Sequence, residues 1–149
     1  MAQSTGGGFG YTLLHAAQVW RTEAAQALAV HELTVPQFLL LMALYRQHRH
    51  GRPPLSQAEV GVRLGMDANT TSQIARALER RGLIERARSA ADARARALAL
   101  TGPGVERSIA ASATARAHND LFFAALSPGQ LETLGTLLES LTTASEHRS

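Results

Sequence analysis

Residues 69–73 form a run of short polar side chains that could bond to the edges of nucleic-acid bases. The run reads Asn-Thr-Thr-Ser-Gln. Asn and Gln amides can pair with adenine through two hydrogen bonds, while Ser and Thr hydroxyls can bond to bases or to phosphates. Arg76 and Arg80 follow, one helical turn apart, where they could flank the phosphate backbone. The pattern favours a helix that reads duplex DNA, and an ordinary polar surface helix remains the alternative.

A second group of charged residues lies farther along the chain and could enter a DNA groove. It consists of Arg88, Asp92, Arg94 and Arg96. Arginine is attracted into a narrow minor groove because negative potential is concentrated there. Asp92 precedes Arg94 by two residues and could hold its guanidinium in one pose through a charge-assisted hydrogen bond. An exposed ion pair of little energetic value is the alternative for these two residues.

Positive charge is concentrated in the middle of the chain. Residues 46–107 contain twelve arginines and six acidic residues, and the chain has no lysine. The segments on either side, 1–45 and 108–149, each contain more acidic residues than arginines. A basic segment between two weakly acidic ends favours contact with a polyanion such as double-stranded DNA, although a solvated charged surface gives the same count.

Capping motifs predict short helices around the polar run. The tetrapeptides 34–37 (Thr-Val-Pro-Gln) and 56–59 (Ser-Gln-Ala-Glu) are both capping boxes, which mark the start of a helix. Asp67 is placed to cap the next helix, over 68–81, which Gly82 ends. Two helices joined by a short connector that contains Gly are typical of a helix-turn-helix.

Residues 94–100 alternate large and small side chains, in the order Arg-Ala-Arg-Ala-Leu-Ala-Leu. Intrinsic propensity alone predicts a helix over 88–100, because Ala, Arg and Leu are strong helix formers. A strand, however, would bring the four large side chains to one face, whereas a helix would scatter them. We therefore predict a strand that pairs with 82–86, so that 89–93 form the tip of a hairpin that carries the second charged group.

Amphipathic helices are predicted near both ends of the chain. Apolar residues recur every three or four positions in 11–30 and in 105–124, and again after a capping box at 127–130. These helices could form an intertwined dimer interface, with a monomeric bundle as the alternative. The predicted organisation is a flexible tail over 1–10, a dimerisation helix over 11–32, a winged helix-turn-helix DNA-binding region over 33–100, and dimerisation helices over 101–149.

The predicted fold class is therefore mainly α with a small β-hairpin wing (α+β). The chain has no cysteine, which excludes disulfides and thiolate metal sites. No run of apolar residues is long enough to span a membrane, and the first ten residues do not resemble a signal peptide, so we expect a cytoplasmic protein without a membrane partner. His31-Glu32 begins like a zinc-protease motif, but Val35 stands where the second histidine should be. We predict no catalytic residue, no metal site and no cofactor, and hence no enzyme.

Taken together, several short motifs resemble the MarR family of regulators over about residues 10–145. They are Leu33–Phe38, Leu55–Gln57, Leu64–Asp67, Leu78–Arg86, Asp92–Arg94 and Leu98–Gly104. The resemblance implies a homodimer whose winged lobes read a pseudo-palindromic operator in double-stranded DNA. It also implies major-groove contacts from Asn69, Thr70 and Ser72, and a minor-groove contact from Arg94 with Asp92 as its acidic partner.

Pattern and resemblance together give the full set of predicted DNA-binding residues. It contains Ser56, Ala68, Asn69, Thr70, Ser72, Gln73, Arg76, Arg80, Arg88, Asp92, Arg94 and Arg96.

The resemblance further implies release from DNA by a small anionic aromatic effector, bound between the dimer helices and the winged lobe. The tentative lining consists of His15, Trp20, His31, Phe38 and Met42, with Leu14 and Arg21 beside them. Aromatic residues on an apolar stripe are more commonly core or interface residues, which is the alternative for His15 and Trp20. The peroxide-sensing branch of the family needs a reactive cysteine, which this chain lacks. The zinc-sensing branch uses His and Glu on the second and fifth helices, where this chain has apolar residues.

The resulting hypothesis is a sequence-specific transcription regulator that represses its target as a homodimer. The alternative is a winged helix that contacts another protein and has no specific DNA target. The arginine excess in 46–107 argues against this alternative. A salt titration separates the two, because phosphate contacts make affinity fall steeply as salt rises.

Overall fold

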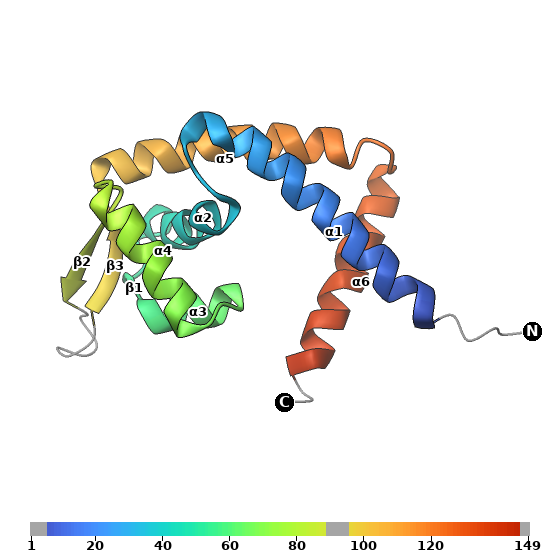
Figure 1. The fold of residues 1–149 in the computed structure, drawn as a ribbon, viewed down its shortest axis with the longest axis horizontal. Coiled ribbons are helices and arrows are strands. Elements are labelled where there is room, and N and C mark those ends of the chain that lie inside the picture. Colours follow the sequence, from blue (N-terminus) through green and yellow to red (C-terminus); the bar gives the residue numbers. More distant parts are fainter. Residues whose placement is uncertain (1–5, 89–95, 147–149) are drawn as a thin grey trace, which may run out of the picture. The chain divides into compact units, whose positions relative to one another are not determined.

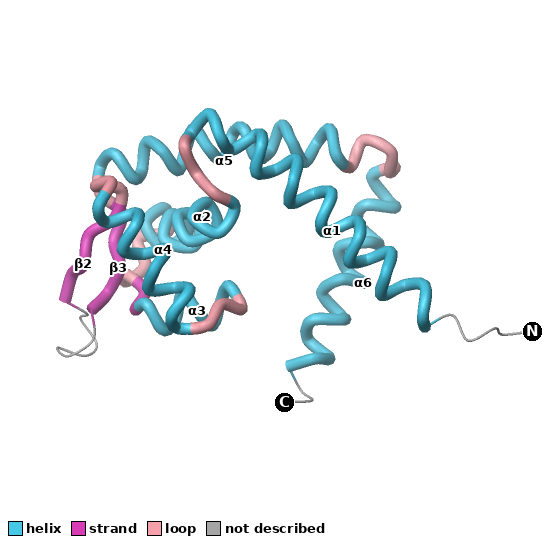
Figure 2. Tube along the Cα trace, viewed as in Figure 1, coloured by secondary structure: helices cyan, strands magenta, loops and turns pink. Residues whose placement is uncertain are grey.

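The computed structural model describes residues 6–88 and 96–146, which are mostly helical, with three short strands at one edge (Figures 1 and 2). The chain divides into two compact units, Met1–Ala115 and Arg116–Ser149. The first unit contains α1 (Gly6–Leu28), η1 (Ala29–His31), α2 (Val35–Arg49), β1 (Leu55–Ser56), α3 (Gln57–Leu64), α4 (Ala68–Arg80), β2 (Ile84–Arg88), β3 (Arg96–Leu100) and the first part of α5 (Gly102–Phe122). The second contains the end of α5 and all of α6 (Pro128–Glu146). The predicted fold class is confirmed.

Helix α1 begins at Gly6, five residues before the predicted start at Tyr11. The Thr12 hydroxyl donates a hydrogen bond to the carbonyl oxygen of Gly8, 3.0 Å away, which belongs to this extension. Residues 6–10 were expected to be part of a flexible tail. They are helical because lengthening an existing helix adds one backbone hydrogen bond per residue, which offsets the low helix propensity of glycine. The remainder of the predicted tail, 1–5, lies outside the described residues.

The predicted capping boxes form as expected. At the start of α2, the Thr34 hydroxyl accepts a hydrogen bond from the Gln37 N–H (3.3 Å), and the Gln37 side chain accepts one from the Thr34 N–H (3.0 Å). Ser56 and Glu59 make the same reciprocal pair at the start of α3, at 3.2 and 2.7 Å. Each box satisfies two N–H groups that a helix start leaves without intrahelical partners, so these boundaries are set locally.

The wing is a three-stranded antiparallel sheet in the order β1-β3-β2. Strands β2 and β3 pair, as expected, with Arg86 opposite Leu98. Strand β2 begins at Ile84 and not at the predicted residue 82, because the N–H groups of Gly82 (φ 68°) and Leu83 still bond to the end of α4. The predicted tip lies outside the described residues. Strand β1 was not predicted, because two residues are too few to show an alternating pattern. It pairs Leu55 with Leu98, which makes β3 the central strand and buries both Ala97 and Leu98.

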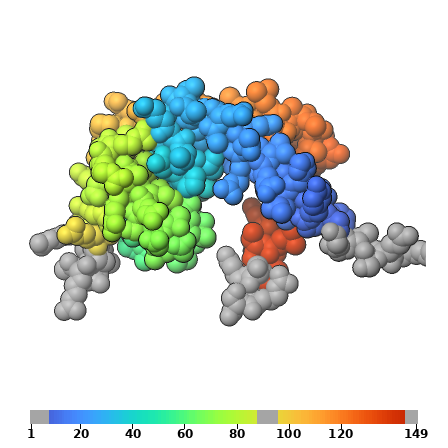
Figure 3. Space-filling model, in the orientation of Figure 1, coloured from blue at the N-terminus to red at the C-terminus, as the bar shows by residue number. Residues whose placement is uncertain are grey.

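Helix α2 lies at the centre of the first unit and contacts α1, α3, α4 and β3. Its buried Leu40 and Leu41 pack in one core with Leu78 of α4 and with Ile84 and Leu98 of the wing. In Figure 3 the green side chains of α3 and α4 form one continuous packed lobe. Burying these side chains fixes the two helices of the helix-turn-helix against the wing, each fully buried aliphatic side chain contributing about 1.5–3 kcal/mol.

Helix α5 starts in close contact with the base of the wing. The Thr101 hydroxyl donates to the Gly82 carbonyl oxygen (2.6 Å) and accepts from the Gly104 N–H (3.1 Å). A Cβ atom on Gly104 would lie 1.9 Å from the Leu83 carbonyl oxygen, which is far inside van der Waals contact. Glycine is therefore required at this position for the helix to approach the strand.

The second unit, made of the end of α5 and all of α6, has an apolar surface. Ser127 and Gln130 form the predicted capping box of α6, at 3.3 and 2.9 Å. Within this unit α6 leaves Leu131, Leu137, Leu138 and Leu141 exposed. An apolar stripe of this kind is typical of a surface that another chain covers.

In the described part of the chain, no one helix combines the length and the apolarity that a bilayer crossing needs. Only a pair of helical segments taken together is long and apolar enough, Gly8–His31 with Val35–Arg49, and the chain bends by 71° between them.

Candidate nucleic-acid interface

The first turn of α4 is organised by the N-cap residue Asp67. One carboxylate oxygen, Oδ1, accepts the Thr70 N–H at 2.8 Å, and the other, Oδ2, accepts the Thr70 hydroxyl at 2.7 Å. The Thr70 hydroxyl, and after it the Thr70 N–H, hold the pKa of the Asp67 carboxyl below its usual value. The first turn is exposed at Ala68, Asn69 and Thr70. It therefore presents polar groups to solvent beside the Asp67 carboxylate.

One residue of the polar run belongs to the core instead. Thr71 is fully buried, and its hydroxyl donates to the Asp67 carbonyl oxygen at 2.8 Å. A Cβ on Gly61 of α3 would lie 3.0 Å from the Thr71 hydroxyl, so the two helices approach each other closely here. Thr71 therefore joins Ala75 and Leu78 on the buried face of α4. The sequence run 69–73 did not reveal this, because the burial depends on a glycine of another helix.

The opposite face of α4 carries the remaining predicted contacts. Four exposed residues follow one another at spacings of three or four positions, which places them along one side of the helix: Asn69, Gln73, Arg76 and Arg80. Ser72 is half-buried at the edge of this face. Ser56 is also half-buried, and its hydroxyl caps α3.

Both long strands of the wing carry an arginine at the end that adjoins residues 89–95. The register places Arg88 of β2 opposite Arg96 of β3, and Arg96 is exposed. Asp92 and Arg94 lie outside the described residues. The predicted clamp between these two side chains therefore stays a prediction.

Arg86 has a positioning role that the sequence analysis missed. Its guanidinium donates from Nε to the Glu79 carboxylate (3.1 Å) and from Nη1 to the Gln57 side-chain oxygen (3.1 Å). The side chain is 19% exposed. Arg86 thus joins β2 to both α4 and α3, and it fixes α4 relative to the wing. The only local signal was an arginine at the end of the motif Leu78–Arg86, which does not identify its partners.

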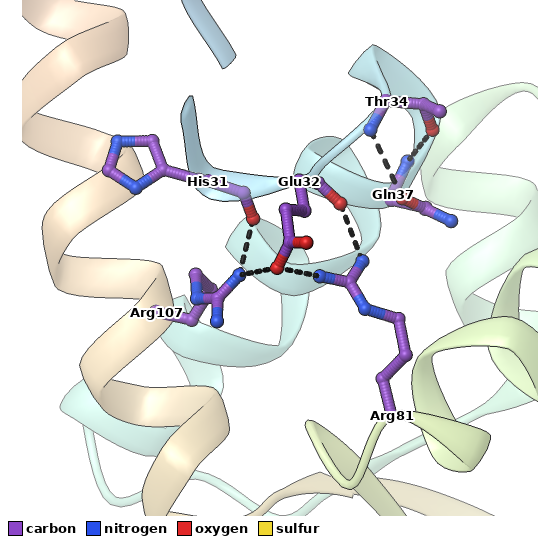
Figure 4. A network of polar contacts seen from close by, with 6 residues as sticks. All are labelled: His31, Glu32, Thr34, Gln37, Arg81 and Arg107. Carbon is purple, nitrogen blue, oxygen red and sulfur yellow. Dashed lines mark hydrogen bonds and ion pairs between the residues drawn. The ribbon is translucent and has the colours of Figure 1, made fainter. Parts of the chain in front are cut away.

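A second network fixes the other end of α4 (Figure 4). Glu32 has a left-handed backbone (φ 54°), and its carbonyl oxygen accepts a hydrogen bond from Arg81 Nη1 at 2.6 Å. Its carboxylate lies 3.9 Å from Arg81 Nη2 and 3.8 Å from Arg107 Nη1. Arg107 also donates to the His31 carbonyl oxygen. The corner between α1 and α2 is thereby joined to the C-terminal end of α4 and to α5.

His31, a predicted effector residue, bonds to α5. Its Nε2 lies 2.7 Å from the Thr114 hydroxyl, and in Figure 4 the imidazole points away from Arg107 and Arg81. This contact helps to hold η1 against α5. His31 therefore has a structural role that the sequence did not indicate.

The other predicted effector residues are spread along α1 and α2. His15 is exposed and stacks on Tyr11, with ring centroids 6.1 Å apart. Trp20, Phe38 and Met42 are half-buried and pack against the core.

An open groove of about 860 Å³ lies beside the first helix corner. It is lined by Gln18, Arg21, Thr22, Ala25 and Gln26 of α1 and by residues 33–36. Of the residues predicted to surround an effector, Arg21 lines this groove, whereas the five principal ones do not. The groove is mixed in character, with one cationic side chain among amides and small apolar groups.

Within residues 6–88 and 96–146, no three or more His, Asp or Glu side chains gather closely enough to hold a metal ion.

Comparison with known proteins agrees with this geometry. The model of the MarR family matches residues 31–95. The HTH-type transcriptional regulator YdcH of Bacillus subtilis (strain 168), itself uncharacterized, is 33% identical over 116 residues, or 78% of each protein. The HTH-type transcriptional repressor Rv2887 of Mycobacterium tuberculosis is 30% identical over 132 residues, which cover 89% of this chain and 91% of that protein.

Solved structures give the same result. A probable transcriptional regulator from Pseudomonas aeruginosa superposes with a TM-score of 0.80 at 30% identity, covering 91% of this chain and 97% of its own. Rv2887 bound to DNA superposes with a TM-score of 0.69 at 27% identity, covering 89% of this chain and 95% of its own. Rv2887 with salicylic acid gives 0.68 at 30% identity, covering 89% and 94%.

Both the resemblance in the motifs and the predicted winged helix-turn-helix are therefore confirmed. Members of this family regulate transcription and are not enzymes. The chain belongs to the MarR family of winged helix-turn-helix transcription regulators.

Proposed function

We propose that the protein is a repressor that binds a pseudo-palindromic operator as a homodimer. The observation that carries the proposal is the division of α4 into two faces. Thr71, Ala75 and Leu78 are buried, while an exposed polar face begins at the capped first turn. A helix held by its buried face, with its N-terminal polar side chains exposed, is suited to enter a major groove. Since its target is DNA, we expect the protein in the cytoplasm.

The proposed major-groove contacts come from the exposed side and edge of α4. Asn69, Thr70 and Ser72 would face base edges, and Arg76 and Arg80 would contact phosphates. The full α4 and α3 set is Ser56, Ala68, Asn69, Thr70, Ser72, Gln73, Arg76 and Arg80.

The wing would supply the minor-groove contact. Arg88 and Arg96 stand opposite each other on β2 and β3, so positive residues flank the wing. In the proposal Arg94 enters the groove, where the negative potential is highest, and Asp92 orients its guanidinium.

Dimerisation would use the terminal helices, over 11–32 with the added turn at 6–10, and over 101–149. Both contain large apolar side chains that their own unit leaves exposed. They include Phe9, Tyr11, Leu13 and Leu14 on α1 and Leu131, Leu137, Leu138 and Leu141 on α6. Covering these surfaces with a second copy removes apolar area from water, which favours association.

A small aromatic anion is the proposed effector. Rv2887 has been crystallised with salicylic acid, and this chain is 30% identical to it in that comparison. The proposed contacts remain His15, Trp20, His31, Phe38 and Met42. Arg21 lines the neighbouring groove, and its guanidinium could pair with the carboxylate of the effector.

Selection of bound duplexes from random DNA, followed by a salt titration on the selected sequence, tests the proposal. We expect a site with two-fold symmetry, and a log–log slope of affinity against salt of several units, because several phosphates are neutralised. Arg80→Ala should reduce the slope by about two units, because the dimer loses one phosphate contact from each of its two chains. Arg46→Ala, an exposed change on α2 that belongs to neither the proposed DNA contacts nor the proposed dimer helices, is the matched control. A flat salt response, or no selected sequence, would favour the protein-contact alternative.

A further inference from the structure

The capping carboxylate of α4 fixes the direction of the hydrogen bonds made by the Thr70 hydroxyl. Asp67 Oδ2 lies 2.7 Å from Thr70 Oγ1, and Asp67 Oδ1 lies 2.8 Å from the Thr70 nitrogen. The hydrogen bonds from Thr70 hold the pKa of the Asp67 carboxyl below its usual value, so this group is ionised near neutral pH. An ionised carboxylate can only accept hydrogen bonds.

The hydroxyl proton of Thr70 must therefore point to Asp67. A threonine hydroxyl has one proton to donate and two lone pairs that accept. With its proton occupied, Thr70 offers only lone pairs to a partner outside the protein. The side chain is exposed on the first turn of α4, where such a partner can reach it.

Few groups on DNA can donate to these lone pairs. Phosphate oxygens are acceptors, so a phosphate contact from this hydroxyl is excluded while the bond to Asp67 holds. In the major groove the donors are the N4 amino group of cytosine and the N6 amino group of adenine, whereas guanine and thymine present O6, N7 and O4 acceptors.

We propose that Thr70 is a specificity-determining residue that accepts a hydrogen bond from the amino group of cytosine or adenine, and that Asp67 sets this polarity. The inference rests on the proposed function, because it requires α4 to lie in a major groove. In a homodimer the preference appears at two symmetry-related positions of the operator.

The adjacent Thr71 provides a matched comparison. It has the same side chain, one position along, but it is fully buried and donates to the Asp67 carbonyl oxygen. Removing its hydroxyl changes the packing between α3 and α4 and leaves the DNA-facing groups in place. A general effect of losing a threonine hydroxyl from α4 can thus be separated from a loss of base reading.

The test is selection of bound sites from random duplex DNA by the full-length wild type and by Thr70→Val, Thr70→Ser, Asp67→Asn and Thr71→Val. We expect Thr70→Val to lose discrimination at one position per half-site, by about ten-fold, the usual effect of one hydrogen bond. Thr70→Ser should keep the preference. Thr71→Val should leave the preferred sequence unchanged, whatever its affinity.

Asp67→Asn gives the sharpest outcome. Asn is as good an N-cap as Asp, so the helix start should form. Its amide NH₂ can take the place of Oδ2 and donate to Thr70 Oγ1, which releases the hydroxyl proton to point outward. The preferred base at the same position should then change from cytosine or adenine to guanine or thymine.

An unchanged base preference in folded Thr70→Val overturns the inference, and so does a wild-type preference for guanine or thymine at the position that Thr70→Val affects. If Asp67→Asn fails to fold, as judged by circular dichroism, the Thr70→Val and Thr70→Ser pair still decides. Failure of the proposed function is a separate result, since the wild type would then select no sequence at all.

Discussion

Helices α4 and α6 are both amphipathic, but they differ in where their apolar faces are covered. The apolar face of α4 is buried within its own unit, where Ala75 and Leu78 are fully inaccessible to solvent. On α6, Leu137 and Leu141 are each 58% exposed. The contrast shows that one chain suffices to shape the proposed DNA-reading surface, whereas the proposed spacing of two such surfaces requires a second chain.

The largest expected effect comes from changing α6. Leu137→Asp combined with Leu141→Asp places two charges on the exposed apolar stripe and should convert the proposed dimer to a monomer. Operator affinity should fall by about 100-fold or more, because two linked half-site contacts become independent. Sedimentation velocity and a DNA-binding titration measure the two effects.

Glu139→Gln, an exposed change on the same helix, is the control and should leave the dimer intact. A double variant that is still dimeric would place the interface on a different surface.

An intermediate effect is expected on the buried face of α4. Leu78→Ala should lower the free energy of unfolding by about 2–5 kcal/mol, because it leaves a cavity among α2, α4 and the wing. Arg76→Ala, two residues earlier on the exposed face, should change it by about 0.5 kcal/mol or less. Urea unfolding of both variants measures the difference, and equal losses would contradict the division of α4 into two faces.

The smallest effect concerns the capped start of α4 and depends on pH. The pKa of Asp67 is lowered in the folded protein, chiefly by the Thr70 hydroxyl, so the cap stabilises the fold above the unfolded-state pKa and loses this contribution as pH falls. Asp67→Ala should therefore lower Tm at pH 7. The difference from wild type should shrink below about pH 4.

Thermal melts from pH 7 to pH 3 measure this dependence. Glu85→Ala, which removes another exposed carboxylate, serves as the control. A Tm difference for Asp67→Ala that stays constant down to pH 3 would show that the charge of the cap is unimportant.

Features that act over a few residues could be predicted from the sequence. The caps at Thr34, Ser56 and Asp67 each bond to a residue three positions on, so sequence spacing is sufficient evidence for them. The wing strand β3 was predicted by its alternation. Strand β1 was missed because its two residues form a strand only through pairing with β3.

Features that depend on distant residues could not be predicted. The burial of Thr71 follows from its contact with Gly61, and the fixed position of Arg81 follows from Glu32, 49 residues away. Arg86 is likewise defined by partners on two other helices. Of the predicted site, the sequence identified the exposed residues of α4, but it did not identify the side chains that hold this helix in place.

The glycine at position 104 limits how this protein can change by mutation. Its backbone lies so close to the Leu83 carbonyl oxygen that an added Cβ would be 1.9 Å from it. Every missense change that alters one nucleotide of a glycine codon introduces a Cβ. No single-base missense change can therefore replace this residue without separating the start of α5 from the base of the wing, so packing restricts position 104 although it is outside the proposed DNA contacts.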